Sequence, residues 1–60
     1  MKPRNKSYAE LRAKIGTPKE VAKLLGVHQR TLERRESGEV EITDEMNLAL
    51  VCLFAKKFQP

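Results

Sequence analysis

The hydrophobic pattern of the chain is clearest in residues 17–38, where apolar positions recur at helical spacing on both sides of Gly26. Before this glycine, one face of a helix would carry Val21, Ala22, Leu24 and Leu25. Lys19 and Lys23, four positions apart, would share the opposite face. The pattern therefore predicts an amphipathic helix over residues 18–25, with one side in the core and the other in water.

The residues at both ends of this helix agree with the periodicity. Thr17 is a preferred N-cap residue, Pro18 occupies the first helical position, and Glu20 stands at the capping-box position. Gly26 follows the last apolar pair and can adopt the left-handed conformation that ends a helix. Val27 then returns to the core, so a second helix should begin directly after a tight turn.

This second helix is expected over residues 28–37, with Gly38 as its stop. If Leu32 points inward, a rotation of about 100° per residue directs Arg30 and Arg34 almost directly outward. Two arginines therefore share one exposed face. Glu36 falls close to the direction of Leu32 and should be partly buried beside a cation, for which Arg12 and Arg35 are the candidates.

Two further helices flank this pair. Ser7 and Glu10 form a capping-box pattern before residues 8–15, in which Tyr8 belongs to the inner stripe and Gly16 ends the helix. Thr43 caps a last helix over residues 44–57, with acids in its first turn and lysines in its last. Nine residues are expected in the core: Leu11, Ile15, Val21, Ala22, Leu25, Val27, Leu32, Leu50 and Leu53. In the connector over residues 39–42, Val40 and Ile42 should tuck under the domain.

The last helix carries apolar residues on most of its sides, which is typical of a helix that is buried on most sides. A core of this size can cover only one stripe, so a symmetric homodimer is expected. Its interface would consist of Leu48, Val51, Phe54, Ala55 and Phe58. Single exposed apolar residues are the alternative explanation. Cys52 lies on the same helix and is expected to be a small core residue.

The stretch TPKEVAKLLGVHQRTLERRESG resembles the helix-turn-helix of the phage repressor and Cro family, which includes small XRE-type bacterial regulators. The resemblance rests on the spacing of Ala22, Gly26 and Leu32, on the apolar positions around them, and on the ending RRESG. It covers about residues 10–55, and it implies a small all-α, four-helix domain that binds double-stranded DNA. The chain departs from the family at Arg35, where an apolar or aromatic residue is usual.

The resemblance also implies roles for individual residues. The residues facing DNA bases would be Gln29, Arg30 and Arg34, and those near phosphates would be Thr17, Lys19 and His28. Lys23 and Thr31, beside this set, are also expected to contact the DNA backbone. Arginine can donate two hydrogen bonds to guanine, and glutamine can pair with adenine. Arg12 would be the family's first-helix arginine that pairs with Glu36.

Charge is distributed unevenly along the chain. The net charge is +4, but residues 1–35 hold ten Lys or Arg against three Glu, residues 36–55 hold five acids and no base, and Lys56 and Lys57 follow. The basic part is the part with the helix-turn-helix pattern, which suits a polyanion on one side of the domain. Residues 1–6 lack an apolar anchor and are expected to form a flexible basic arm before a single domain over residues 7–58. Lys2, Arg4 and Lys6 would then contact a minor groove or phosphates, or remain solvated.

Composition points away from several other classes. His28 is the only histidine and Cys52 the only cysteine, so neither a disulfide, a zinc site nor a catalytic dyad is indicated. The acids Glu39, Glu41, Asp44 and Glu45 straddle a loop and a helix start, which a capped, solvated turn explains better than a metal cluster. No phosphate-binding loop, transmembrane run or signal peptide is apparent. The expectation is a cytoplasmic protein that is no enzyme and needs no cofactor or small-molecule ligand.

Two hypotheses follow. The first is a dimeric transcriptional repressor of phage or mobile-element type that binds an inverted repeat, with an excisionase-like architectural protein as a minor version. The second is a protein-interaction module that keeps the helix-turn-helix fold and binds a partner through its apolar last helix, as an antitoxin or a small phage inhibitor does. The basic exposed face of residues 28–37 favours the first hypothesis.

Overall fold

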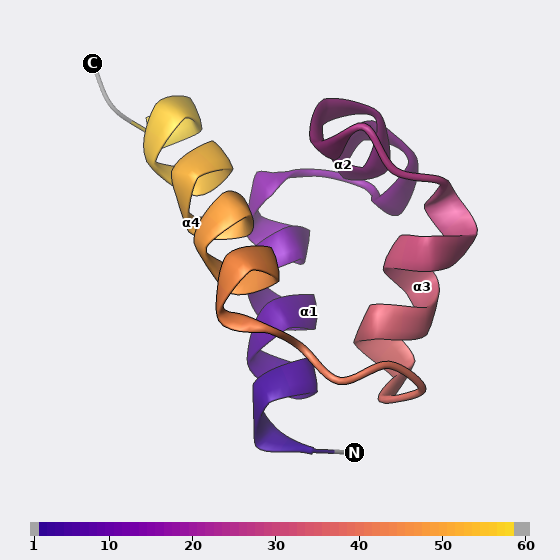
Figure 1. Cartoon of the computed structure of the whole chain (residues 1–60). Helices are drawn as coiled ribbons and strands as arrows, with labels where there is room; N and C mark the ends of the chain where they lie inside the picture. Colours follow the sequence, from indigo (N-terminus) through magenta and orange to yellow (C-terminus); the bar gives the residue numbers. More distant parts are fainter. Residues whose placement is uncertain (1, 59–60) are drawn as a thin grey trace.

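The computed structural model describes residues 2–58, which form four helices and no strand. The helices are α1 (Pro3–Ile15), α2 (Pro18–Leu25), α3 (Gln29–Ser37) and α4 (Asp44–Phe58). α1 contacts each of the other three, and α2 packs on both α3 and α4. Figure 1 shows α4 running beside α1 while α3 lies on the opposite side, with α2 across one end. The all-α, four-helix class predicted from the sequence is confirmed.

Capping and glycine geometry set the ends of the last three helices. The Thr17 hydroxyl accepts a hydrogen bond from the Glu20 backbone N–H at 3.2 Å, and Thr43 accepts one from Met46 in the same way. Gly26 and Gly38 end α2 and α3 with φ angles of 73° and 90°, in the left-handed region that a Cβ atom disfavours. These local signals are the reason that the predicted bounds of α2, α3 and α4 are confirmed to within one residue.

The prediction for the N-terminal segment is wrong. Residues 3–6, expected as a flexible arm, are the first turn of α1, and Ser7 does not cap the helix. Pro3 stands at the first helical turn, where its missing N–H costs nothing. Asn5 is 1% exposed and donates to the carbonyl oxygens of Arg35 at 2.6 Å and Val40 at 2.8 Å. These tertiary bonds hold a turn for which the sequence offers no side-chain cap.

The core lies between α1, α2 and α4 and reaches the inner face of α3. Its buried apolar residues are Tyr8, Ile15, Val21, Ala22, Leu32, Ile42 and Leu50. The other predicted core positions, Leu11, Leu25, Val27 and Leu53, are half-buried and pack against this cluster. Ile42 is 1% exposed and Val40 is half-buried, so the connector after Gly38 does fold under the domain.

Two apolar residues face water against expectation. Leu24 is 63% exposed, because Val21, Ala22 and Leu25 define the inner face of α2 and Leu24 projects more than a quarter turn from its centre. Cys52 is exposed because Leu50 and Leu53 set the inner face of α4. Across residues 2–58, no helix has the length and apolar character needed to cross a membrane.

Candidate nucleic-acid interface

The outer face of α3 is polar and basic. Leu32 is the one residue of this helix that is fully buried, whereas Gln29, Arg30 and Arg34 are exposed. The exposed residues line a shallow, open hollow on the surface, together with flanking residues: His28, Gln29, Arg30, Glu33, Arg34, Ser37 and Glu39. The helical geometry that directs Arg30 and Arg34 away from Leu32 is thus present, and the two arginines project from one rigid element.

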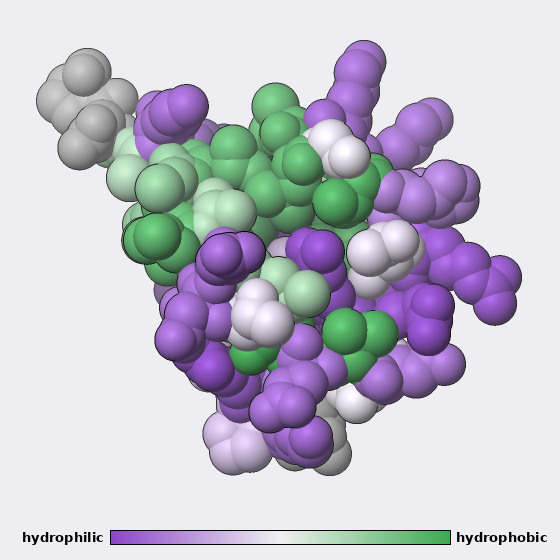
Figure 2. Space-filling view, viewed as in Figure 1, coloured by the Kyte–Doolittle hydropathy of each residue, from purple (hydrophilic) through white to green (hydrophobic). Residues whose placement is uncertain are grey.

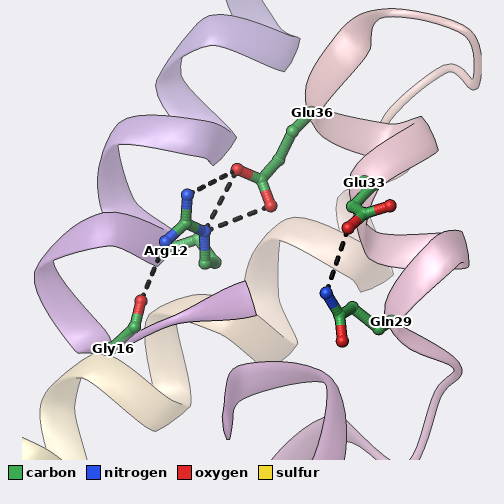
Figure 3. A network of polar contacts seen from close by, with 5 residues as sticks. All are labelled: Arg12, Gly16, Gln29, Glu33 and Glu36. Atoms are coloured by element: carbon green, nitrogen blue, oxygen red, sulfur yellow. Dashed lines mark hydrogen bonds and ion pairs between the residues drawn. The ribbon is translucent and has the colours of Figure 1, made fainter. Parts of the chain in front are cut away.

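An ion pair behind this face ties α3 to α1. The Arg12 Nη2 atom lies 2.9 Å from Glu36 Oε1, and Arg12 Nε donates to both carboxylate oxygens at 3.1 Å (Figure 3). Arg12 Nη1 also donates to the Gly16 carbonyl at 2.8 Å. The side chains are only 17% and 14% exposed, so the pair is largely shielded from water. The pairing of Arg12 with Glu36 that the family resemblance implied is present, and it fixes the inner side of α3.

Arg35 points inward, away from the exposed polar face of α3. Its Nη1 atom donates to the Tyr8 hydroxyl at 3.3 Å, and its backbone carbonyl accepts the bond from Asn5. Its Nε atom is buried without a hydrogen-bond partner among the described residues. Arg35 therefore occupies the usually apolar position as a half-buried residue that packs against α1, and it leaves Arg30 and Arg34 as the outward arginines of α3.

Two acids, Glu33 and Glu39, contact side chains that the resemblance assigns to base contacts. Gln29 Nε2 donates to Glu33 Oε1 at 3.1 Å, and Arg34 Nε lies 3.4 Å from Glu39 Oε2. The spacing of four positions between Gln29 and Glu33 is a helical neighbour signal that could have revealed the first contact. The second depends on the left-handed turn at Gly38, whose exit direction residue spacing does not give. The side chain of Arg30 has no such partner among the described residues.

The candidate backbone-contacting residues lie on α2 and at the start of α3: Thr17 and Lys19 begin α2, Lys23 is in its last turn, and His28 and Thr31 begin α3. Thr17 and His28 are the N-cap residues, and the His28 Nδ1 atom accepts a hydrogen bond from the Arg30 backbone N–H at 3.2 Å. An accepting Nδ1 leaves the ring proton on Nε2, where it is free to donate to an anion. Thr17, Lys19, Lys23 and His28 are exposed and Thr31 is half-buried, so each of the five side chains reaches the surface. Sequence reasoning missed the capping role of His28 because histidine is outside the usual N-cap set.

Lys2, Arg4 and Lys6 lie elsewhere. They stand at the first turn of α1, and Arg4 forms an ion pair with Asp44 at the start of α4. This end of α1 is joined to the last turn of α3 through Asn5, and not to the N-terminal end where His28 and Gln29 lie. Residues 3–6 are thus helical and not a loose arm, whereas a contact of these basic residues with a minor groove or with phosphates stays a prediction.

The expected interface residues of α4 form an apolar surface. Leu48, Val51 and Phe58 are 63%, 43% and 57% exposed, whereas Phe54 and Ala55 are half-buried. The rings of Phe54 and Phe58 pack with their centroids 4.7 Å apart. Figure 2 shows apolar residues gathered over α4 and toward α2, while the side of the molecule with α3 is hydrophilic. The basic face and the apolar face therefore lie on different helices.

The geometry defines a class of domain. Two helices meet at a left-handed glycine, the second presents a polar face, and a first helix and a last helix support them, which is the helix-turn-helix arrangement. A comparison with protein families agrees: the helix-turn-helix family model of the XRE type matches residues 9–59. The chain belongs to this family of DNA-binding regulators. No curated protein and no solved structure matches the chain significantly.

Proposed function

We propose that this protein is a dimeric transcriptional repressor of phage or mobile-element type that binds an inverted repeat in double-stranded DNA, with α3 in the major groove. The observation that carries the proposal is the exposed polar face of α3, with Arg30 and Arg34 projecting from a helix whose inner side is fixed by Leu32 and by the Arg12–Glu36 pair. The major groove of DNA admits an α-helix, and hydrogen-bond donors on the outward face of that helix can reach the base edges. A repressor of the kind this chain resembles acts in the bacterial cytoplasm, where its DNA lies.

The proposed division of labour follows position in the fold. Gln29, Arg30 and Arg34 contact bases, because they stand on the outward face of α3. The residues of α2 and of the start of α3 contact the sugar-phosphate backbone: Thr17, Lys19, Lys23, His28 and Thr31. Contacts to phosphates set register and orientation, whereas contacts to base edges set sequence preference.

The proposed dimer uses the apolar surface of α4. Leu48, Val51, Ala55 and Phe58 recur at helical spacing on the side of α4 away from Leu50. A two-fold axis along this surface would bury the exposed apolar side chains and pair two α3 helices. Half-sites would then lie about 34 Å apart, one turn of DNA. Sedimentation velocity at about 100 μM protein tests this part; a monomer that stays monomeric on operator DNA would contradict it.

The central experiment begins by selecting bound sequences from a random DNA pool and then compares two variants. Arg34→Ala should lower affinity by about 1–3 kcal/mol and relax the preference at one base pair per half-site. Lys19→Ala should weaken binding to all sequences nearly equally, and should flatten the salt dependence by about 0.9 in log–log slope per half-site because one fewer counterion is released.

If Arg34→Ala binds DNA with unchanged affinity and with unchanged preference at every position, α3 is not the helix that reads the sequence. The interaction-module function would then be favoured, since the exposed apolar residues of α4 could equally receive a partner protein. If the random DNA pool instead returns no preferred sequence at all, the interaction-module function predicts that Phe58→Ser abolishes binding of the partner protein.

A further inference from the structure

Two carboxylates stand on the face that should meet DNA. Glu33 and Glu39 line the same shallow hollow as Arg34, and both are exposed. A carboxylate facing the phosphate backbone is repelled by it, so each acid weakens binding to DNA of any sequence. Acids that weaken DNA binding need another role on this face, and the side chains that they contact indicate what this role is.

Each acid contacts a candidate reading side chain through an atom that leaves its other donors available. Glu39 approaches Arg34 at Nε, at 3.4 Å, so both terminal nitrogens of the guanidinium remain free to donate to guanine O6 and N7. Glu33 accepts one hydrogen bond from Gln29 Nε2, at 3.1 Å (Figure 3). The amide keeps its oxygen and one N–H, which is the pair of groups that matches adenine N6 and N7.

We propose that Glu33 and Glu39 are positioning residues that hold Gln29 and Arg34 in reading orientation before DNA arrives. This inference rests on the proposed function of α3. A free arginine samples many rotamers and is drawn to any nearby phosphate, so part of its binding energy is sequence-independent. Glu39 restrains the guanidinium and opposes the phosphate attraction, so that Arg34 gains most where a guanine accepts its terminal N–H groups. The acids thus lower the affinity for DNA of any sequence and increase the discrimination between sequences.

The two acids lie in different parts of the fold, which makes them separable by mutation. Glu33 belongs to α3 itself, one turn after Gln29, whereas Glu39 belongs to the connector after Gly38. The connector is held by the buried side chain of Ile42 and by the bond from Asn5 to the Val40 carbonyl. The position of Glu39 is therefore set by the fold independently of α3's own side chains.

The main test compares Glu39→Gln with Glu41→Gln. Both remove one exposed negative charge from the connector, but Glu41 makes no ion pair among the described residues. Both variants should bind all DNA somewhat more tightly. The reading position of Arg34 is found as the base pair whose preference disappears in Arg34→Ala. At that position the wild type should favour guanine by roughly 5- to 150-fold.

Glu39→Gln should reduce this preference by about two- to fivefold, the range that an exposed ion pair supports. Glu41→Gln should leave the preference intact, and Glu39→Gln should have no effect on preference in an Arg34→Ala background. For the second acid, Glu33→Ala should weaken the preference at the Gln29 position, and Glu33→Gln should restore it because an amide oxygen can still accept the bond. Unfolding midpoints of all variants should stay near the wild-type value.

Two results would overturn the inference, and they are distinguishable. If Glu39→Gln and Glu41→Gln raise affinity equally and leave every base preference unchanged, the acids act only as charges, and the proposed DNA-reading function stands. If the wild-type protein itself selects no sequence from the random pool, the proposed function fails and the positioning role fails with it.

Discussion

Removing only one partner of the Arg12–Glu36 ion pair should lower the free energy of unfolding considerably. Glu36→Ala removes the acceptor of three Arg12 contacts of 2.9–3.1 Å and leaves the guanidinium with the Gly16 carbonyl. Breaking a buried pair by removing one partner costs about 3–5 kcal/mol. Because the side chains retain 14–17% exposure, the lower end applies, at about 3 kcal/mol.

This loss is large for so small a domain. A chain of 60 residues at about 0.05–0.15 kcal/mol per residue has a total unfolding free energy of about 3–9 kcal/mol. Glu36→Ala should therefore remove a third or more of the stability. Replacing both partners, as in Arg12→Met with Glu36→Leu, should restore most of it, since apolar residues of similar volume carry no desolvation penalty.

Urea unfolding followed by far-UV circular dichroism measures these free energies directly. Glu10→Ala, at an exposed acid of α1, is the matched control and should change stability by less than about 0.5 kcal/mol. A cost for Glu36→Ala under about 1 kcal/mol would show that the pair behaves like a surface pair. A double variant as unstable as the sum of its singles would refute the argument that the unpaired charge is the main cost.

Four further variants test the packing. Leu32→Ala should cost about 2–5 kcal/mol by urea unfolding, whereas Leu24→Ala, at a 63% exposed position, should change stability little; equal effects would contradict the assigned faces. Gly26→Ala should cost about 1–2 kcal/mol through backbone strain alone, because φ is 73° and nothing lies within 4 Å of an added Cβ; an unchanged melting temperature would contradict this. Asn5→Leu should cost about 1–3 kcal/mol for each carbonyl left unbonded, and a neutral result would show that the two Asn5 hydrogen bonds do not stabilise the fold.

The sequence predicts the helix-turn-helix unit well because its signals are local. Thr17, Gly26 and Gly38 act through their own backbone and hydroxyl groups, so α2 and α3 can be bounded without knowledge of the rest of the chain. Leu32 is equally predictable, because it is the only apolar residue of the second helix and must therefore mark its inner side.

The first turn of α1 is not predictable in this way. Asn5 is a polar residue without an apolar neighbour pattern, and its burial is compensated by carbonyls 30 and 35 positions later in the chain. The same limit applies to the candidate site: outward arginines follow from periodicity, whereas the contact of Arg34 with Glu39 depends on the path of the chain after α3. Leu24 is exposed although its spacing places it on the apolar face, because a helix of 8 residues offers too few positions to define the centre of that face.

The division of α3 into one buried and many exposed positions has a consequence for changing what the protein binds. Five of its nine residues are exposed, namely Gln29, Arg30, Glu33, Arg34 and Ser37, and none of them contributes to the apolar core. These five positions can therefore vary without loss of the fold. A library of variants at these positions, with Leu32, Arg35 and Glu36 kept, should yield folded proteins with many different DNA preferences. The same freedom would let related chains diverge in target while sharing one scaffold.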